Sequence, residues 1–91
     1  MSTIEELQDR LAEQRYIADG YIASLKLTLE IRAQQRRYAL SDETTLSHKE
    51  VAKDEVRHCD ERTSDYVSQL TEQYEKIDAL QRQIAEHPDT L

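Results

Sequence analysis

Apolar residues recur in steps of three and four along the second half of the chain, and this spacing limits the fold more than any other feature. The series is Val56, Cys59, Thr63, Tyr66, Leu70, Gln73, Ile77, Leu80 and Ile84. A mean spacing of about 3.5 residues holds one side of an α-helix against a partner helix in a left-handed coiled coil. Val67 and Tyr74 widen this seam, and the polar members Thr63 and Gln73 can fix the register between helices. We therefore predict one long helix with a single apolar seam.

The first half of the chain carries apolar residues on two opposite faces of a predicted helix. The first series is Ile4, Leu7, Leu11, Ala18, Ile22, Leu25 and Leu29. The second series, which we call the outer stripe, is Tyr16, Gly20, Ala23, Leu27 and Ile31. Leu25 and Leu27 lie about 200° apart around a helix, so one partner helix can cover only one series. The outer stripe therefore predicts contact with a second copy of the chain or with another protein.

Capping motifs and a proline mark where the predicted helices begin and end. Ser2 with Glu5, and Ser47 with Glu50, each have the spacing of a capping box, in which two residues satisfy each other's backbone N–H groups. An earlier start at Ser41, before Asp42 and Glu43, is the alternative for the second helix, and we prefer Ser47 with one turn allowed before it. Pro88 cannot continue a helix, so the second helix should end before it.

These signals predict one all-α domain built as an antiparallel, coiled-coil-like two-helix hairpin. The expected parts are a helix at about 3–39, a connection at about 40–46, a helix at about 47–86 and a short C-terminal tail. An alternative is three helices, because Asp19-Gly20 is a turn signal in the first helix. A lone hairpin buries little core, so we expect a homodimer that forms a four-helix bundle.

Charge and hydropathy exclude several classes of partner. The net charge of −7 opposes direct binding to nucleic acid, because neutralisation of phosphates drives such binding. We find no run of about 20 apolar residues, the length that spans a bilayer, so no membrane partner is expected. A single Cys cannot form an intrachain disulfide, which fits a reducing compartment. The expected location is the cytoplasm.

Two charged groups are candidate partner surfaces. One is a basic ridge with a four-residue spacing, made of Lys49, Lys53 and Arg57. The other is an acidic group near the open end of the hairpin, made of Glu72, Glu75 and Asp78. The acidic group suggests an alternative function, a phage-type decoy that occupies the basic groove of a nucleic-acid-binding protein. Ordinary solvated coiled-coil faces would give the same pattern.

One spacing has an association with metal chemistry. Glu55 and His58 share a helix face, and Glu30 lies at about the same height on the first helix. This set resembles the ferritin-like bundles, which implies a carboxylate and histidine metal site built across a dimer. The pair flanks the seam instead of occupying it, however, and His58 should point toward water. A solvated surface pair is therefore the interpretation that we favour, and no cofactor or metal is expected.

The sequence favours an interaction protein over an enzyme. Cys59 occupies a seam position, where a buried and inert thiol is expected. Gly20 is the only glycine, so no glycine-rich loop can hold a phosphate, and two helices form a poor cleft. We expect a non-enzymatic protein–protein interaction module, such as a small regulator, adaptor, inhibitor or chaperone, whose protein partner is unidentified.

Overall fold

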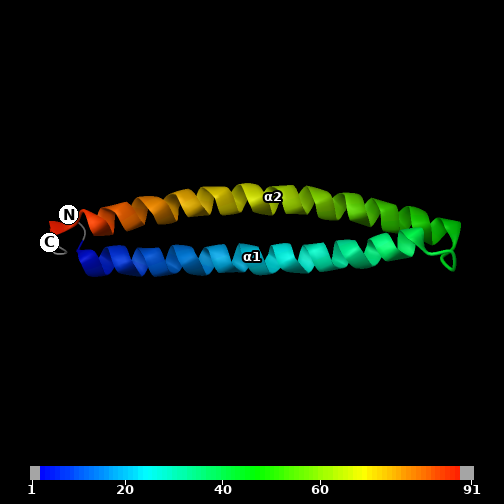
Figure 1. The fold of residues 1–91 in the computed structure, drawn as a ribbon, viewed down its shortest axis with the longest axis horizontal. Coiled ribbons are helices and arrows are strands. Elements are labelled where there is room, and N and C mark those ends of the chain that lie inside the picture. The colour runs from blue at the N-terminus through cyan, green and yellow to red at the C-terminus, as the bar shows by residue number, and fades with distance from the viewer. Residues whose placement is uncertain (1–2, 89–91) are drawn as a thin grey trace.

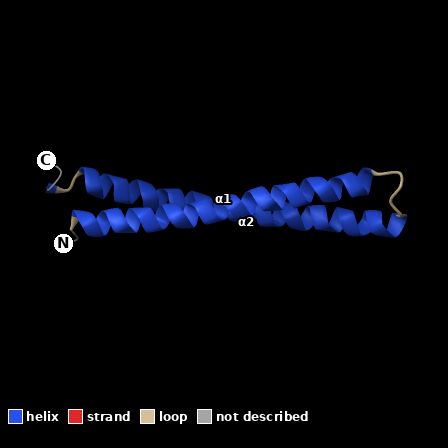
Figure 2. Ribbon diagram, turned by 90° about the horizontal axis from the view of Figure 1, so that it is seen from below, coloured by secondary structure: helices blue, strands red, loops and turns tan. Residues whose placement is uncertain are grey.

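The chain forms two long antiparallel helices in a computed structural model that describes residues 3–88 (Figure 1). Helix α1 spans Ile4–Leu40 and helix α2 spans Leu46–Ala85. The hairpin measures 66 × 15 × 14 Å, with the start of α1 and the end of α2 at one end and the turn at the other. Seen from below, the helices cross near their middles, as in a coiled coil (Figure 2). The predicted all-α hairpin is confirmed.

Helix α1 is continuous through Asp19 and Gly20, so the alternative of three helices is wrong. Gly20 has an ordinary helical backbone, with no positive φ. The helix tolerates it because a single internal glycine costs only about 1 kcal/mol relative to alanine.

Threonine hydroxyls cap both described helix starts. The Thr3 side chain accepts a hydrogen bond from the Glu6 backbone N–H at 3.2 Å, while Ser2 lies outside the described residues. The Thr45 side chain accepts from the His48 N–H at 3.3 Å. The predicted cap at Ser47 is therefore wrong, because α2 starts at Leu46 and places Ser47 inside its first turn. The connection is correspondingly short, at residues 41–45.

The predicted seam of α2 faces α1 along its whole length. Its buried members are Cys59, Leu70, Gln73 and Ile77, and its other members are half-buried. Ala52 is also buried, seven residues before Cys59, so the same spacing continues toward the turn. The largest apolar cluster joins Leu70 and Ile77 to Ala18 of α1.

The inward face of α1 differs in part from the predicted series. Leu7 and Ala18 are buried as expected, but Thr28 is buried in place of Leu29, which is 46% exposed. Inward-facing positions follow one another in alternating steps of three and four residues. The step after Leu25 is three residues, so the next inward position is 28 and not 29. Thr28 is accommodated because its hydroxyl donates to the Ser24 backbone carbonyl at 2.8 Å.

Polar side chains also link the two helices. The Gln73 side-chain amide donates to the Gln14 backbone carbonyl at 3.2 Å and to the Gln14 side-chain oxygen. Arg32 of α1 pairs with Asp60 of α2 at 2.6 Å. The Thr63 hydroxyl is buried and has no hydrogen-bond partner among the described residues. Gln73 therefore makes the kind of contact that can fix the register, and Thr63 does not.

Candidate functional site

The hairpin exposes more surface than its mass requires. Its accessible surface is 6904 Å². A compact monomer of 10.7 kDa exposes about 5,500 Å² by the usual scaling of surface with mass. The excess of about 1,400 Å² exceeds the roughly 800 Å² that each partner contributes to a standard protein interface. The exposed helix faces are therefore the candidate sites.

The outer stripe lies on the side of α1 that faces away from α2. Tyr16 is 81% exposed and Leu27 is 58% exposed, while Gly20 and Ala23 are also exposed and Ile31 is half-buried. No atom lies within 4 Å of the position that a Cβ on Gly20 would occupy, apart from the neighbouring residues and the local helix backbone. The outer stripe is therefore open at Gly20, its smallest residue, and α2 does not cover it.

A second exposed apolar surface, which we call the apolar flank, runs beside the contact between the helices. Its members are Ile22, Leu29, Val67 and Tyr74. Each follows an inward-facing position by four residues, so each lies about 40° further around its helix. Leu29, Val67 and Tyr74 are about half exposed, and Ile22 is half-buried against the central apolar cluster.

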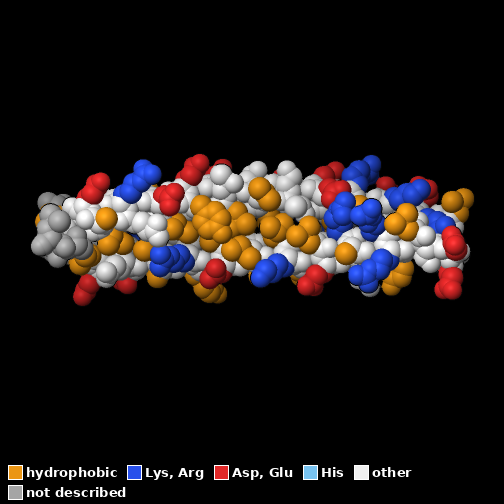
Figure 3. Space-filling view, viewed as in Figure 1, with side chains coloured by type: hydrophobic (Ala, Val, Ile, Leu, Met, Phe, Trp, Pro, Cys, Tyr) orange, Lys and Arg blue, Asp and Glu red, His pale blue; other side chains and the backbone are white. Residues whose placement is uncertain are grey.

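Both helices present the apolar flank on the same side of the hairpin. Corresponding flanks of antiparallel helices in a coiled coil lie side by side. Arg36 follows Leu29 by seven residues and Lys53 precedes Val67 by fourteen, so each lies on the same face of its helix as the flank. Arg36 and Lys53 line one groove of about 360 Å³ near the turn, which shows that the two faces adjoin. Figure 3 shows apolar side chains of both helices meeting over the middle of this face, with many Lys and Arg side chains toward the turn.

Sequence reasoning missed the apolar flank as a separate surface. It placed Leu29 in the inward series and treated Val67 and Tyr74 as a widening of the α2 seam. A sequence signal for the flank does exist. In both helices, large apolar residues occur four positions after inward-facing residues.

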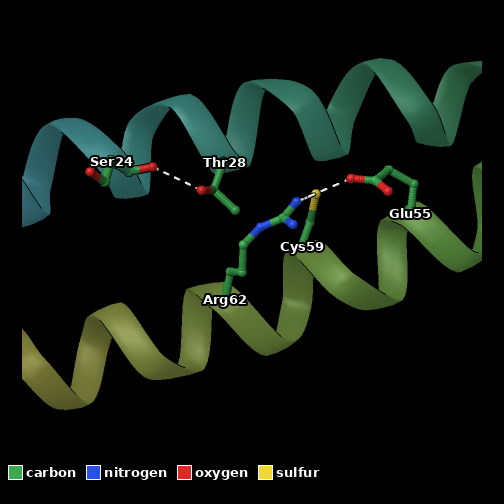
Figure 4. Close-up of polar contacts among 5 residues, drawn as sticks. All are labelled: Ser24, Thr28, Glu55, Cys59 and Arg62. Atoms are coloured by element: carbon green, nitrogen blue, oxygen red, sulfur yellow. Dashed lines mark hydrogen bonds and ion pairs between the residues drawn. The ribbon is translucent and has the colours of Figure 1, made fainter.

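The opposite flank of the hairpin is polar and internally paired. The Arg62 guanidinium donates to Glu55 Oε1 at 3.1 Å and to Cys59 Sγ at 3.2 Å (Figure 4). The hydrogen bond to Glu55, followed by that to Cys59, raises the pKa of Arg62 above its ordinary value. Cys59 is fully buried beneath this pair, which places its thiol out of reach of a reaction partner.

The candidate metal ligands do not gather into a site. Glu30 and His58 are exposed on their helices, and the Glu55 carboxylate is paired with Arg62. Within residues 3–88, no group of three or more His, Cys, Asp or Glu side chains could hold a metal ion. The ferritin-like arrangement is therefore not formed within this hairpin.

Charged side chains of the basic ridge pair locally. Lys53 lies 3.4 Å from Glu50, and Arg57 lies 3.4 Å from Asp54, in both cases one turn away on α2. Such exposed pairs contribute less than about 1 kcal/mol each. Glu72, Glu75 and Asp78 are exposed near the open end, as expected from the sequence. The ridge is therefore partly neutralised by its own helix.

A larger groove of about 460 Å³ lies beside the turn. It is lined by Gln35, Tyr38, Glu43, Thr44, Thr45, His48, Val51 and Ala52. The lining mixes polar and apolar side chains from both helices and from the connection between them.

Comparison of the chain with protein-family models, with curated proteins and with solved structures finds no match. Neither α1 nor α2 contains a stretch that is apolar and long enough to cross a bilayer, as far as the described residues extend.

Proposed function

We propose that the chain is a non-enzymatic protein–protein interaction module that self-associates and uses its remaining apolar helix surface to bind another protein. The observation that carries this proposal is the distribution of apolar side chains around the middle of α1. They lie toward α2 at Leu25, on the apolar flank at Leu29 and on the outer stripe at Leu27. A helix that is apolar on several sides is normally covered on several sides.

The thin core of the hairpin supports the same proposal. Six apolar residues of the described chain are buried, and three of them form the central cluster. Chains of this size commonly gain stability by oligomerisation, and a homodimer would form a four-helix bundle. If a dimer forms, the thermal midpoint of unfolding rises with protein concentration, because association stabilises the folded state by mass action.

The proposed biochemical role is that of a small regulator, adaptor, inhibitor or chaperone. These classes share helical-hairpin scaffolds, and the assignment among them rests on fold-level analogy alone. The outer stripe is the proposed contact for the partner, since Tyr16 and Leu27 are large apolar residues that project from the hairpin.

Photo-crosslinking from within the stripe tests this proposal. A photoreactive amino acid at Ala23, an exposed stripe position, should capture a protein of another sequence in extract from the native host. Leu27→Asp should abolish that capture, because it places a charge in an apolar contact. Leu46→Asp is the matched control, because Leu46 is 76% exposed and lies outside the stripe. Equal capture by wild type and Leu27→Asp would contradict the proposed contact.

The acidic decoy remains a second candidate, favoured by the charge of the open half of the hairpin. Residues 3–22 and 66–88 together hold nine acidic and four basic side chains. A decoy contact would weaken steeply as salt is added, whereas an apolar contact would change little. Charge reversal at Glu72, Glu75 and Asp78 should abolish binding only if the decoy function is correct.

A further inference from the structure

We infer that the apolar flank packs against the apolar flank of a second copy of this chain, with the two hairpins antiparallel. The turn of each hairpin then lies over the open end of the other. This inference rests on the proposed self-association and adds its surface and its direction. It also separates the surfaces by role, because the outer stripe stays exposed for a different protein.

The position of the apolar flank along the hairpin fits a symmetric pair. Ile22 is the middle residue of α1, which spans Ile4–Leu40, and Val67 lies close to the middle of α2. A two-fold axis through the middle of the flank would place Ile22 against Ile22 and Val67 against Val67 of the second copy. Apolar surface then meets apolar surface while the hairpins overlap over their full length, as an isologous dimer requires.

The turn half of the hairpin is nearly neutral and the open half is acidic, which favours the antiparallel direction. The turn half, residues 23–65, holds nine acidic and eight basic side chains. The open half, residues 3–22 and 66–88, holds nine acidic and four basic side chains. Beside the flank, Arg32, Arg36 and Lys53 line the groove near the turn. Antiparallel pairing brings this basic groove of each copy over the more acidic open half of the other.

Individual charges on the flank side also fall into opposite pairs. Asp19 precedes Ile22 by three residues and Lys26 follows it by four, so both share its helix face. Under the two-fold axis, Asp19 of one copy therefore meets Lys26 of the other. On α2, Asp78 and Arg57 lie at nearly equal distances on either side of Val67 and would meet in the same way, in competition with the exposed pair that Arg57 makes with Asp54. These pairs form the polar rim that surrounds the apolar centre of a protein interface.

Parallel pairing through the same flank brings like charges together. With both turns at one end, the basic grooves of the two copies would face each other, Arg36 against Lys53. Like-charge contacts across an interface oppose association. The opposite flank is the weaker alternative, because α2 contributes only Glu55, Arg62, Gln69, Lys76 and Gln83 to it, and its apolar residues Ile17, Ile31 and Tyr38 all come from α1.

The area that the pair would cover is available on the hairpin. Each copy exposes about 1,400 Å² more than a compact monomer of its mass, against the roughly 800 Å² per partner of a standard interface. A standard interface is therefore smaller than the area by which the whole hairpin exceeds a compact monomer.

Spin-label distances measured by pulsed electron paramagnetic resonance test the direction. Labels are placed in two single variants of the full chain, Leu46→Cys beside the turn and Ser64→Cys near the middle of α2, both at exposed positions. Cys59 is fully buried, so wild type should take up no label and serves as the control. The antiparallel pair predicts about 60 Å between labels at residue 46 and less than about 30 Å at residue 64, from a rise of 1.5 Å per residue.

Other distances would overturn the inference in distinguishable ways. A short distance at residue 46 in a sample with dimer mass would mean parallel pairing, so the direction would be wrong while self-association stood. A long distance at residue 64 in such a sample would mean that another surface pairs. A monomer at the labelling concentration would overturn this inference together with the proposed self-association.

Variants of the flank test the surface independently. Val67→Glu with Tyr74→Glu should raise the dimer dissociation constant by about tenfold or more, whereas Leu27→Asp should leave it unchanged. Both flank residues are about half exposed in the hairpin, so helix content by circular dichroism should be retained. Dissociation by Leu27→Asp and not by the flank variant would move the dimer contact to the outer stripe.

A charge exchange covers the case in which the flank variant fails to fold. Asp78→Lys and Arg57→Glu should each weaken the dimer, and the two together should restore it, because every Asp78 meets an Arg57 of the other copy. Additive weakening in the double variant would contradict the pairing.

Discussion

Replacing Leu70 with alanine should destabilise the hairpin far more than the same replacement at the residue three positions before it. Leu70 is 8% exposed and belongs to the central apolar cluster with Ala18 and Ile77. Leu70→Ala removes three carbons, each contributing about 0.8 kcal/mol when buried, which gives a loss of about 2 kcal/mol. Val67→Ala removes two carbons from a side chain that is 50% exposed, so its loss in the isolated hairpin is about 0.8 kcal/mol.

Urea unfolding followed by circular dichroism at 222 nm, performed at several protein concentrations, measures both losses. At the lowest concentration the two variants should differ by more than a factor of two. As concentration rises, the loss for Val67→Ala should grow, because the second copy covers Val67 in the proposed dimer. The loss for Leu70→Ala should stay large throughout. Equal losses for the two variants at low concentration would refute the assignment of Leu70 to the core and Val67 to the flank.

Three further predictions follow from the described contacts. Gly20→Ala should stabilise the hairpin by about 0.5–1 kcal/mol in thermal unfolding, because its Cβ would enter open space in the middle of α1; a destabilised variant would show that something covers Gly20. Thr45→Ala should cost about 1 kcal/mol, because it removes the hydroxyl that caps α2, whereas Ser47→Ala should cost less; the opposite order would contradict the observed helix start. Elevating salt from about 0.05 to 0.5 M should leave capture of the partner nearly unchanged, and a steep loss in a binding titration would favour the acidic decoy.

The periodicity of α2 was sufficient to predict a long helix and to identify the face that it turns toward α1. All nine members of the predicted seam lie toward α1, because a helix with one apolar series has one way to bury it. The hairpin topology followed from two helices of similar length around a short connection. The helix starts were less predictable, because serine and threonine both act as N-caps and both occur near each start.

The inward face of α1 could not be assigned fully from its residue types. Around Leu25 apolar residues occupy several directions, so hydrophobicity alone does not select Thr28 over Leu29. The spacing set by α2 selects the threonine, because α2 must pack against positions that repeat every seven residues. The apolar flank was hidden for the same reason, since it is defined by its offset from the inward face.

The central claim is that the hairpin does not satisfy its own apolar surface and self-associates, and sedimentation equilibrium of the full chain tests it most directly. Across about 1–100 μM, in a buffer of moderate ionic strength, the fitted mass should approach twice 10.7 kDa while circular dichroism shows intact helices. A helical species of 10.7 kDa throughout that range would contradict the claim.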